Sequence, residues 1–159
     1  MKPLRSLLFV PGDRPERFDK AAAAGADAII LDLEDAVLPE AKPQARAVAI
    51  PWLASSTYRA LIRINGVDTP WFDEDVEALR EAGCRAVMLP KAEDPSVLNQ
   101  LRLRLGDKVQ WFPLIETAAG LDNASALAQV PGVVRLVFGS VDFARDTGVQ
   151  DENGWLPVR

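Results

Sequence analysis

Short apolar runs alternate along this chain with longer segments of helical periodicity, and this alternation constrains the fold more than any other feature. The runs are Ser6–Val10, Ala28–Leu33, Ala60–Asn65, Ala86–Pro90, Val109–Ile115 and Val134–Phe138. They are apolar almost throughout instead of alternating with polar residues, which is typical of strands buried on both faces of a parallel sheet. The pattern therefore predicts six parallel strands.

Helix signals lie between these runs. The expected helices run from Asp13 to Gly25, from Thr69 to Gly83, from Asp94 to Gly106, and onward from Thr117 with Leu121, Ala124 and Leu127 facing inward. Strict alternation of strand and helix predicts a parallel α/β fold, either a doubly wound sheet or a (β/α) barrel. If the strands follow each other in order, the helices lie on one side. We expect one domain over residues 1–148 and an irregular tail over 149–159.

The composition excludes several classes of function. The 159 residues carry a formal charge of −5, whereas a general nucleic-acid binder needs a basic surface. The chain has no histidine and one cysteine, Cys84, which excludes Ser-His-Asp and Cys-His catalysis and an intrachain disulfide. No apolar stretch is long enough to cross a membrane, and the N-terminal apolar run is too short for a signal peptide. We expect a cytoplasmic protein without nucleic-acid or membrane partners.

Polar side chains follow five of the expected strands where each strand ends. The segments are Asp32-Leu33-Glu34-Asp35, Arg63-Ile64-Asn65, Lys91-Ala92-Glu93, Glu116-Thr117 and Gly139-Ser140-Val141-Asp142. The carboxyl edge of a parallel α/β sheet or barrel is where active sites are built. The glycine-rich fingerprints of dinucleotide and phosphate loops do not occur in the sequence. The candidate site therefore consists of these strand-end residues.

Carboxylates without imidazole or thiolate partners favour a hard divalent cation such as Mg²⁺. Glu116 and Asp142 end neighbouring strands and could share one ion, while Arg63 could hold a substrate carboxylate with both prongs of its guanidinium. Structural roles stay open as well. Arg63 could pair with an acid after the second strand, Glu116 could sit at a helix N-terminus, and Asp142 could cap the segment after Gly139.

Several of these segments together resemble the citrate lyase beta-subunit family, part of the HpcH/HpaI aldolase/citrate lyase superfamily, which includes malyl-CoA and related acyl-CoA lyases. The resemblance runs from Arg5 to about Gly148. It is carried by Arg5-Ser6-Leu7-Leu8-Phe9-Val10-Pro11-Gly12, Asp32-Leu33-Glu34-Asp35-Ala36-Val37, Arg63-Ile64-Asn65, Leu89-Pro90-Lys91, Pro113-Leu114-Ile115-Glu116-Thr117 and Phe138-Gly139-Ser140-Val141-Asp142-Phe143. It implies a TIM-type (β/α)8 barrel, Mg²⁺ dependence and the breaking or forming of a carbon–carbon bond in acyl-CoA substrates.

The resemblance also implies a role for particular residues. Glu116 and Asp142 match the metal ligands, with Glu116 also beside the substrate, and Arg63 matches the arginine that holds the oxo acid. The remaining matches are Glu34 and Asp35 at the reaction centre, and Arg14 and Lys20 at the phosphates of coenzyme A. Family members are longer and supply eight strands, so we expect an incomplete barrel of about six β/α units here. We expect it to form a homo-oligomer, a trimer or a multiple of one.

The resulting hypothesis is a Mg²⁺-dependent carbon–carbon lyase of the citryl-CoA or malyl-CoA type. Its substrate would be a 3-hydroxyacyl-CoA, and its product a 2-oxo acid such as oxaloacetate or glyoxylate. One alternative is hydrolysis of an acyl-CoA thioester at the same site. A pyruvate aldolase is a further one, although aldolases of that kind commonly use a histidine base. The last is a binding fragment or subunit without turnover, completed by a partner.

Overall fold

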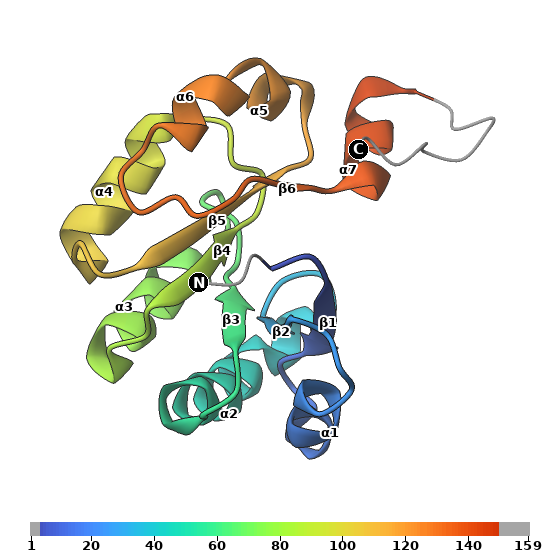
Figure 1. Ribbon diagram of the computed structural model, residues 1–159, viewed down its shortest axis with the longest axis vertical. Coiled ribbons are helices and arrows are strands. Elements are labelled where there is room, and N and C mark those ends of the chain that lie inside the picture. The colour runs from blue at the N-terminus through green and yellow to red at the C-terminus, as the bar shows by residue number, and fades with distance from the viewer. Residues whose placement is uncertain (1–3, 150–159) are drawn as a thin grey trace.

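A computed structural model describes residues 4–149 and shows six parallel strands in one sheet, each paired with the next in sequence order (Figure 1). The strands are β1 (Leu7–Pro11), β2 (Ala28–Asp32), β3 (Ala60–Arg63), β4 (Ala86–Leu89), β5 (Gln110–Ile115) and β6 (Val137–Phe138). All six lie within the runs predicted from the sequence except for Pro11, one residue past the first run. The sheet curves into a half-barrel, so the prediction of an incomplete TIM-type barrel is confirmed.

The helices follow the strands, and all but the last cover the outer face of the curved sheet (Figure 1). They are α1 (Phe18–Ala22), α2 (Lys42–Ser55), α3 (Phe72–Ala82), α4 (Pro95–Leu105), α5 (Ala118–Asp122), α6 (Ala124–Ala128) and α7 (Ser140–Thr147), with short 3-10 turns η1 (Pro15–Arg17) and η2 (Pro39–Ala41). The helix α2 had no helix signal of its own in the sequence analysis. It carries a proline, Pro51, and its apolar residues mark no clear stripe.

Alternate residues along each strand point to the two faces of the sheet. One set, including Ile29, Ile62 and Trp111, belongs to the larger core under the helices. The other set fills the inner face of the half-barrel with Ala28, Ile30, Leu61, Met88, Phe112 and Leu114. Two residues after the last inner apolar residue of β2, β3 and β5, the same face carries a charged residue. These residues are Asp32, Arg63 and Glu116. The strand period thus directs these three into the mouth of the half-barrel.

The helix expected after Thr117 is broken in two. Thr117 caps α5 as predicted, because its hydroxyl accepts from the Gly120 N–H at 3.1 Å. The chain then turns at Asn123, whose side-chain amide donates to the carbonyl of Glu93, and α6 begins anew. Leu121 therefore lies on the surface, 51% exposed, although the single-helix prediction placed it inward, and only Leu127 is buried as expected.

Two other helix starts also differ from the prediction. Asp13 caps no helix; Arg14 precedes the 3-10 turn η1, which lacks a side-chain cap. Thr69 does not cap α3 either, since its hydroxyl donates to the Gly66 carbonyl within a turn and the helix begins later. Asp94 does cap α4, accepting from the Ser96 N–H at 2.7 Å. Hydroxyl side chains satisfy nearby backbone groups in turns as readily as in caps, which explains the difference at Thr69. Oδ1 of Asp13 has no hydrogen-bond partner among the described residues, and its nearest charged partner is Arg14 at 3.7 Å.

The two ends of the sheet, β1 and β6, approach each other at their amino-terminal side. The guanidinium of Arg135, just before β6, donates to the carbonyl of Leu4, just before β1. Leu4 and Val137 also pack on the same inner cluster. At the opposite side α7 stands apart from the ring formed by α1–α6 (Figure 1). Among residues 4–149 no helix is long and apolar enough to cross a membrane.

Candidate active site

Arg63 is the centre of the charged cluster at the mouth of the half-barrel. Its Nε and Nη2 donate to the two carboxylate oxygens of Asp32 at 2.7 and 2.6 Å. Its Nη1 lies 2.9 Å from Oε2 of Glu34 and 3.6 Å from Oδ2 of Asp35. The bidentate edge that was expected to hold a substrate is therefore directed at Asp32. The edge at Nη1 faces the two acids predicted for the reaction centre.

Asp32 was expected among the strand-end residues, but the sequence assigned it no role in the site. Its side chain is only 1% exposed. Besides Arg63, it accepts the backbone N–H groups of Glu34 and Ala36 at 2.9 and 3.1 Å, which fixes the turn after β2. The sequence did contain a signal for Asp32. Along β2 every second residue, Ala28 and Ile30, faces the inside of the half-barrel, and Asp32 is the next in this series. Glu34 comes after the strand has ended.

Glu34 is a buried carboxyl beside Arg63. Burial raises its pKa to about 7, and the charge of Arg63 only partly opposes this effect. The backbone around it is held by Lys42, whose Nζ donates to the carbonyls of Leu33 and Glu34 at 2.8 and 2.9 Å. A carboxyl with such a pKa can both take and release a proton near neutral pH.

Glu116 follows β5 and is 2% exposed. Its Oε1 accepts the backbone N–H of Lys91 at 2.8 Å. Lys91 has φ 45°, the left-handed region, and is the one non-glycine residue with positive φ among those described. Burial raises the pKa of Glu116, and the nearby charge of Asp142 acts in the same direction. A buried carboxylate with another acid nearby favours a cation between them.

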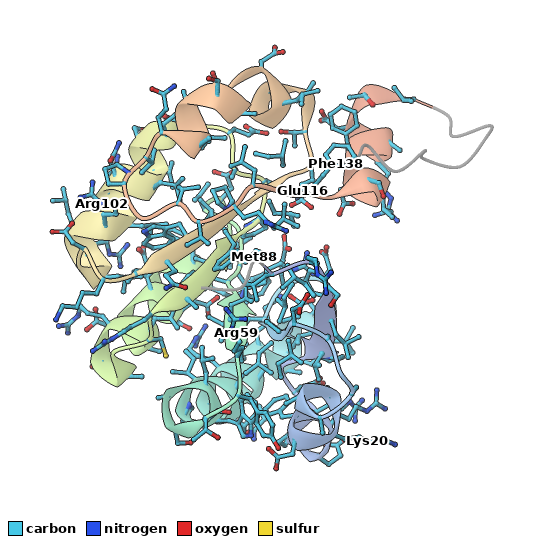
Figure 2. The ribbon with its side chains drawn as sticks, in the orientation of Figure 1. Lys20, Arg59, Met88, Arg102, Glu116 and Phe138 are labelled. Carbon is cyan, nitrogen blue, oxygen red and sulfur yellow. The ribbon has the colours of Figure 1, made fainter. Side chains whose placement is uncertain are left out.

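Gly139 brings the next element against Glu116. A Cβ built on Gly139 would lie 2.9 Å from both Cβ and Oε2 of Glu116, so only glycine fits. The chain continues into α7, where Asp142 accepts from the Arg145 guanidinium at 3.0 Å. Figure 2 shows Glu116 and Phe138 side by side where β5 and β6 end.

These residues line one pocket of about 540 Å³ at the mouth of the half-barrel. Asp35, Arg63, Glu116 and Asp142 supply its charged wall, and Phe9, Val137 and Phe138 are among its apolar residues. Within residues 4–149, no three acidic or cysteine side chains cluster as a complete metal cage. In proteins Mg²⁺ is commonly coordinated by one or two carboxylates, and water and substrate oxygens occupy its remaining coordination positions. The pair Glu116 and Asp142 fits that ion.

The structure thus brings together five of the predicted site residues and leaves two apart. Glu34, which borders an adjoining pocket, contacts Arg63, and the other four line the main pocket. Arg14 and Lys20 are exposed and line none of the pockets found at the mouth. Arg14 lies 3.7 Å from Asp13, and Lys20 projects from the outer side of α1 (Figure 2).

The charged cluster lies at the carboxyl edge of a parallel half-barrel, the position at which α/β-barrel enzymes build their active sites. The family model of the HpcH/HpaI aldolase/citrate lyase family matches residues 5–158, and the chain belongs to this family. The citrate lyase-type resemblance noted in the sequence is thereby confirmed.

Two curated relatives from Cereibacter sphaeroides carry different activities in their names. A (3S)-malyl-CoA thioesterase is 37% identical over 149 residues, which cover 92% of this chain and 52% of the relative. An L-malyl-CoA/beta-methylmalyl-CoA lyase is 39% identical over 165 aligned residues, which cover 94% of this chain and 52% of the relative. The chain therefore spans about half the length of these relatives.

Solved structures with the same fold include the citrate lyase beta subunit of Mycobacterium tuberculosis complexed with oxaloacetate and magnesium. It matches with a TM-score of 0.81 and 36% identity, over 95% of this chain and 66% of that one. A structure of the CitE protein from the same organism contains magnesium, acetoacetate and coenzyme A, with a TM-score of 0.78 and 36% identity over 94% of this chain and 54% of that one. Magnesium in these relatives agrees with the cofactor expected from the sequence.

Proposed function

We propose that this chain carries the metal and oxo-acid site of a Mg²⁺-dependent carbon–carbon lyase that acts on a 3-hydroxyacyl-CoA of the citryl or malyl type. The observation that supports this proposal is the meeting of Arg63, Glu116 and Asp142 at one pocket. A carboxylate pair suits a divalent cation, and an arginine suits the carboxylate of the oxo acid. A cytoplasmic location, with its supply of acyl-CoA, belongs to the same proposal.

Glu116 and Asp142 would hold the ion, which when bound would polarise the oxygen at C3 of the substrate and that of the 2-oxo acid product. Arg63 would meet the substrate carboxylate through the N–H groups that are not directed at Asp32. The apolar wall formed by Phe9 and Phe138 would exclude water from the reacting carbons.

Cleavage begins when a carboxylate removes the proton of the C3 hydroxyl. The C2–C3 bond then breaks, its electron pair passes to the thioester enolate, and a proton returned to C2 gives the shorter acyl-CoA and the 2-oxo acid. Glu34 is our candidate for this proton transfer because its pKa is raised to about 7 by burial. Asp35, on the far side of Nη1 of Arg63, is the second candidate. Exposed Arg14 and Lys20 are assigned to the phosphates of coenzyme A.

Thioester hydrolysis at the same site is the second candidate function, favoured by the thioesterase name of a relative 37% identical to this chain. Incubation with (3S)-malyl-CoA separates the two reactions by their products. Acetyl-CoA with glyoxylate indicates the lyase, whereas malate with free coenzyme A indicates the hydrolase. Binding without either product would instead support a subunit that needs a partner for turnover.

Calorimetric titration of oxaloacetate, with and without Mg²⁺, tests the site itself. We expect binding that requires Mg²⁺, and we expect Glu116→Gln to abolish it because one of two charged ligands is lost. Asp122→Asn is the matched control, since Asp122 is an exposed acid on α5 outside the pocket. Mg²⁺-dependent binding that survives Glu116→Gln would refute the metal assignment, and absent binding in the unaltered chain would refute the site.

A further inference from the structure

We propose that Asp146 is a positioning residue that sets the relation between the two carboxylates assigned to the metal. This inference rests on the proposed function, because it concerns the Mg²⁺ site of Glu116 and Asp142. It depends on one contact outside that pair. Oδ2 of Asp146, in α7, accepts the backbone N–H of Ala118, the first residue of α5, at 2.8 Å.

Ala118 stands two residues after Glu116, so the contact ties α7 to the corner that carries the first metal ligand. The first amides of a helix have no acceptor within the helix and need one from elsewhere. Thr117 supplies an acceptor to the Gly120 N–H at 3.1 Å. The Ala118 N–H instead donates to the carboxylate of Asp146, which lies 28 residues further along the chain.

Asp146 also lies one helical turn after Asp142 on the same side of α7. A side chain anchored at this position fixes the rotation of the helix about its axis, and with it the direction of Asp142. The other end of α7 is held at Gly139, whose N–H donates to the Ile115 carbonyl at 2.9 Å. The two contacts bracket Asp142 and attach both flanks to the segment around Glu116.

Between these two contacts α7 packs through Phe143, whose ring centroid lies 5.1 Å from that of Phe138 in β6. Phe143 is its one buried residue among those described. Two acids one turn apart on a helix repel each other slightly, so this pair is unfavourable for the helix alone. In the structure Asp146 accepts from the Ala118 N–H and Asp142 accepts from the Arg145 guanidinium, so each acid has a separate partner that offsets the repulsion.

The test compares Mg²⁺ affinity, measured by calorimetry, in variants of the full chain. Asp146→Ala removes the acceptor and should weaken Mg²⁺ binding roughly tenfold, the lower end of the usual effect for residues that orient metal ligands. Asp146→Asn keeps an acceptor oxygen and should restore most of the affinity. The matched control is Asp122→Ala, an exposed acid on α5 with unchanged affinity expected.

The donor can be removed separately. Ala118→Pro deletes the N–H at the first helical position, where proline is tolerated, and Thr117 before it already has the extended φ −137° and ψ 159° that proline requires. We expect the same loss of Mg²⁺ affinity as in Asp146→Ala, and no further loss in the double variant. The Ala118→Pro variant therefore tests the inference even if Asp146→Ala does not fold.

Hydrogen exchange at the Ala118 amide provides a readout that needs no metal. Exchange should be faster in Asp146→Ala and close to the unaltered rate in Asp146→Asn. Faster exchange with unchanged Mg²⁺ affinity would overturn the positioning role while leaving the proposed function intact. Failure of the unaltered chain to bind Mg²⁺ would refute the proposed function first, and the positioning role with it.

Discussion

At the scale of single residues, the site is organised by one buried ion pair. Arg63 donates to both carboxylate oxygens of Asp32 through Nε and Nη2, and its Nη1 faces the carboxyl group of Glu34. Removing one partner of a buried pair leaves a charge without compensation, so such pairs are strongly interdependent. The same burial that strengthens the pair raises the pKa of Glu34 to about 7. Stability and proton transfer therefore depend on the same few side chains.

Glu34 should make the metal-free protein less stable as the pH rises. Its pKa in the folded chain, about 7, exceeds the ordinary value of 4.5, so its contribution is fully present below pH 4.5 and is lost as the pH rises to about 7. The loss should be roughly 1–3 kcal/mol, since a tenfold difference in proton affinity corresponds to about 1.4 kcal/mol. Urea unfolding at several pH values measures it.

The control is Glu34→Gln, which cannot ionise. The difference in unfolding free energy between this variant and the unaltered chain should change across the same pH window. Glu116, whose pKa is also raised by burial, is present in both proteins, so the difference reports Glu34 together with its repulsion by Glu116. A difference that stays constant from pH 4.5 to 7 would show that folding does not raise the pKa of Glu34.

At the scale of elements, a second buried acid joins three of them behind the site. Asp75 in α3 is 0% exposed. Its Oδ1 accepts from Arg46 Nε of α2 at 2.7 Å. Its Oδ2 accepts from both the backbone N–H and the side-chain amide of Asn65, just after β3. Asp75 thereby fixes the loop after β3 relative to two helices, and with it the end of the strand that carries Arg63.

Asp75→Ala should destabilise the fold by roughly 3 kcal/mol, the lower end of the cost of breaking a buried pair. Arg46 Nε and the Asn65 amide groups lose their buried partner, whereas Arg46 Nη1 keeps its ion pair with Glu74 at 2.8 Å. The matched control is Asp73→Ala in the same helix. Asp73 is paired with Arg104 but its side chain is 81% exposed, and exposed pairs contribute at most about 1 kcal/mol. Urea unfolding compares the two variants. Equal effects would mean that the buried network contributes no more than a surface pair.

At the scale of the whole molecule, the half-barrel presents two sheet ends. Each end strand, β1 and β6, has one neighbouring strand within the described residues. Large apolar side chains near them and outside the pocket are exposed, including Leu8 and Val134. An edge strand with a single neighbour within the described residues can pair with a further strand. We propose that a second copy of the chain supplies it, in keeping with the homo-oligomer, a trimer or a multiple of one, that is expected from the sequence.

Sedimentation velocity over a range of concentrations should show a defined species larger than a monomer. Leu8→Lys should shift it toward the monomer, because a charge on an edge strand disfavours strand pairing. Leu103→Lys is the matched control, since Leu103 is 89% exposed on α4, away from both end strands. A monomer at all concentrations would contradict the predicted assembly.

The sequence by itself determined the parallel strands and the edge that carries the site. Apolar runs, caps and glycines are local signals, and the two-residue period of a strand turns Asp32, Arg63 and Glu116 to the same face. The tertiary structure decided which residues interact: Arg63 donates to Asp32, and the Ala118 N–H donates to Asp146. These contacts join residues 31 and 28 positions apart. The first contact follows from the register of β2 and β3, in which Asp32 and Arg63 lie directly opposite each other. The second follows from the placement of α7, and no local pattern specifies either one.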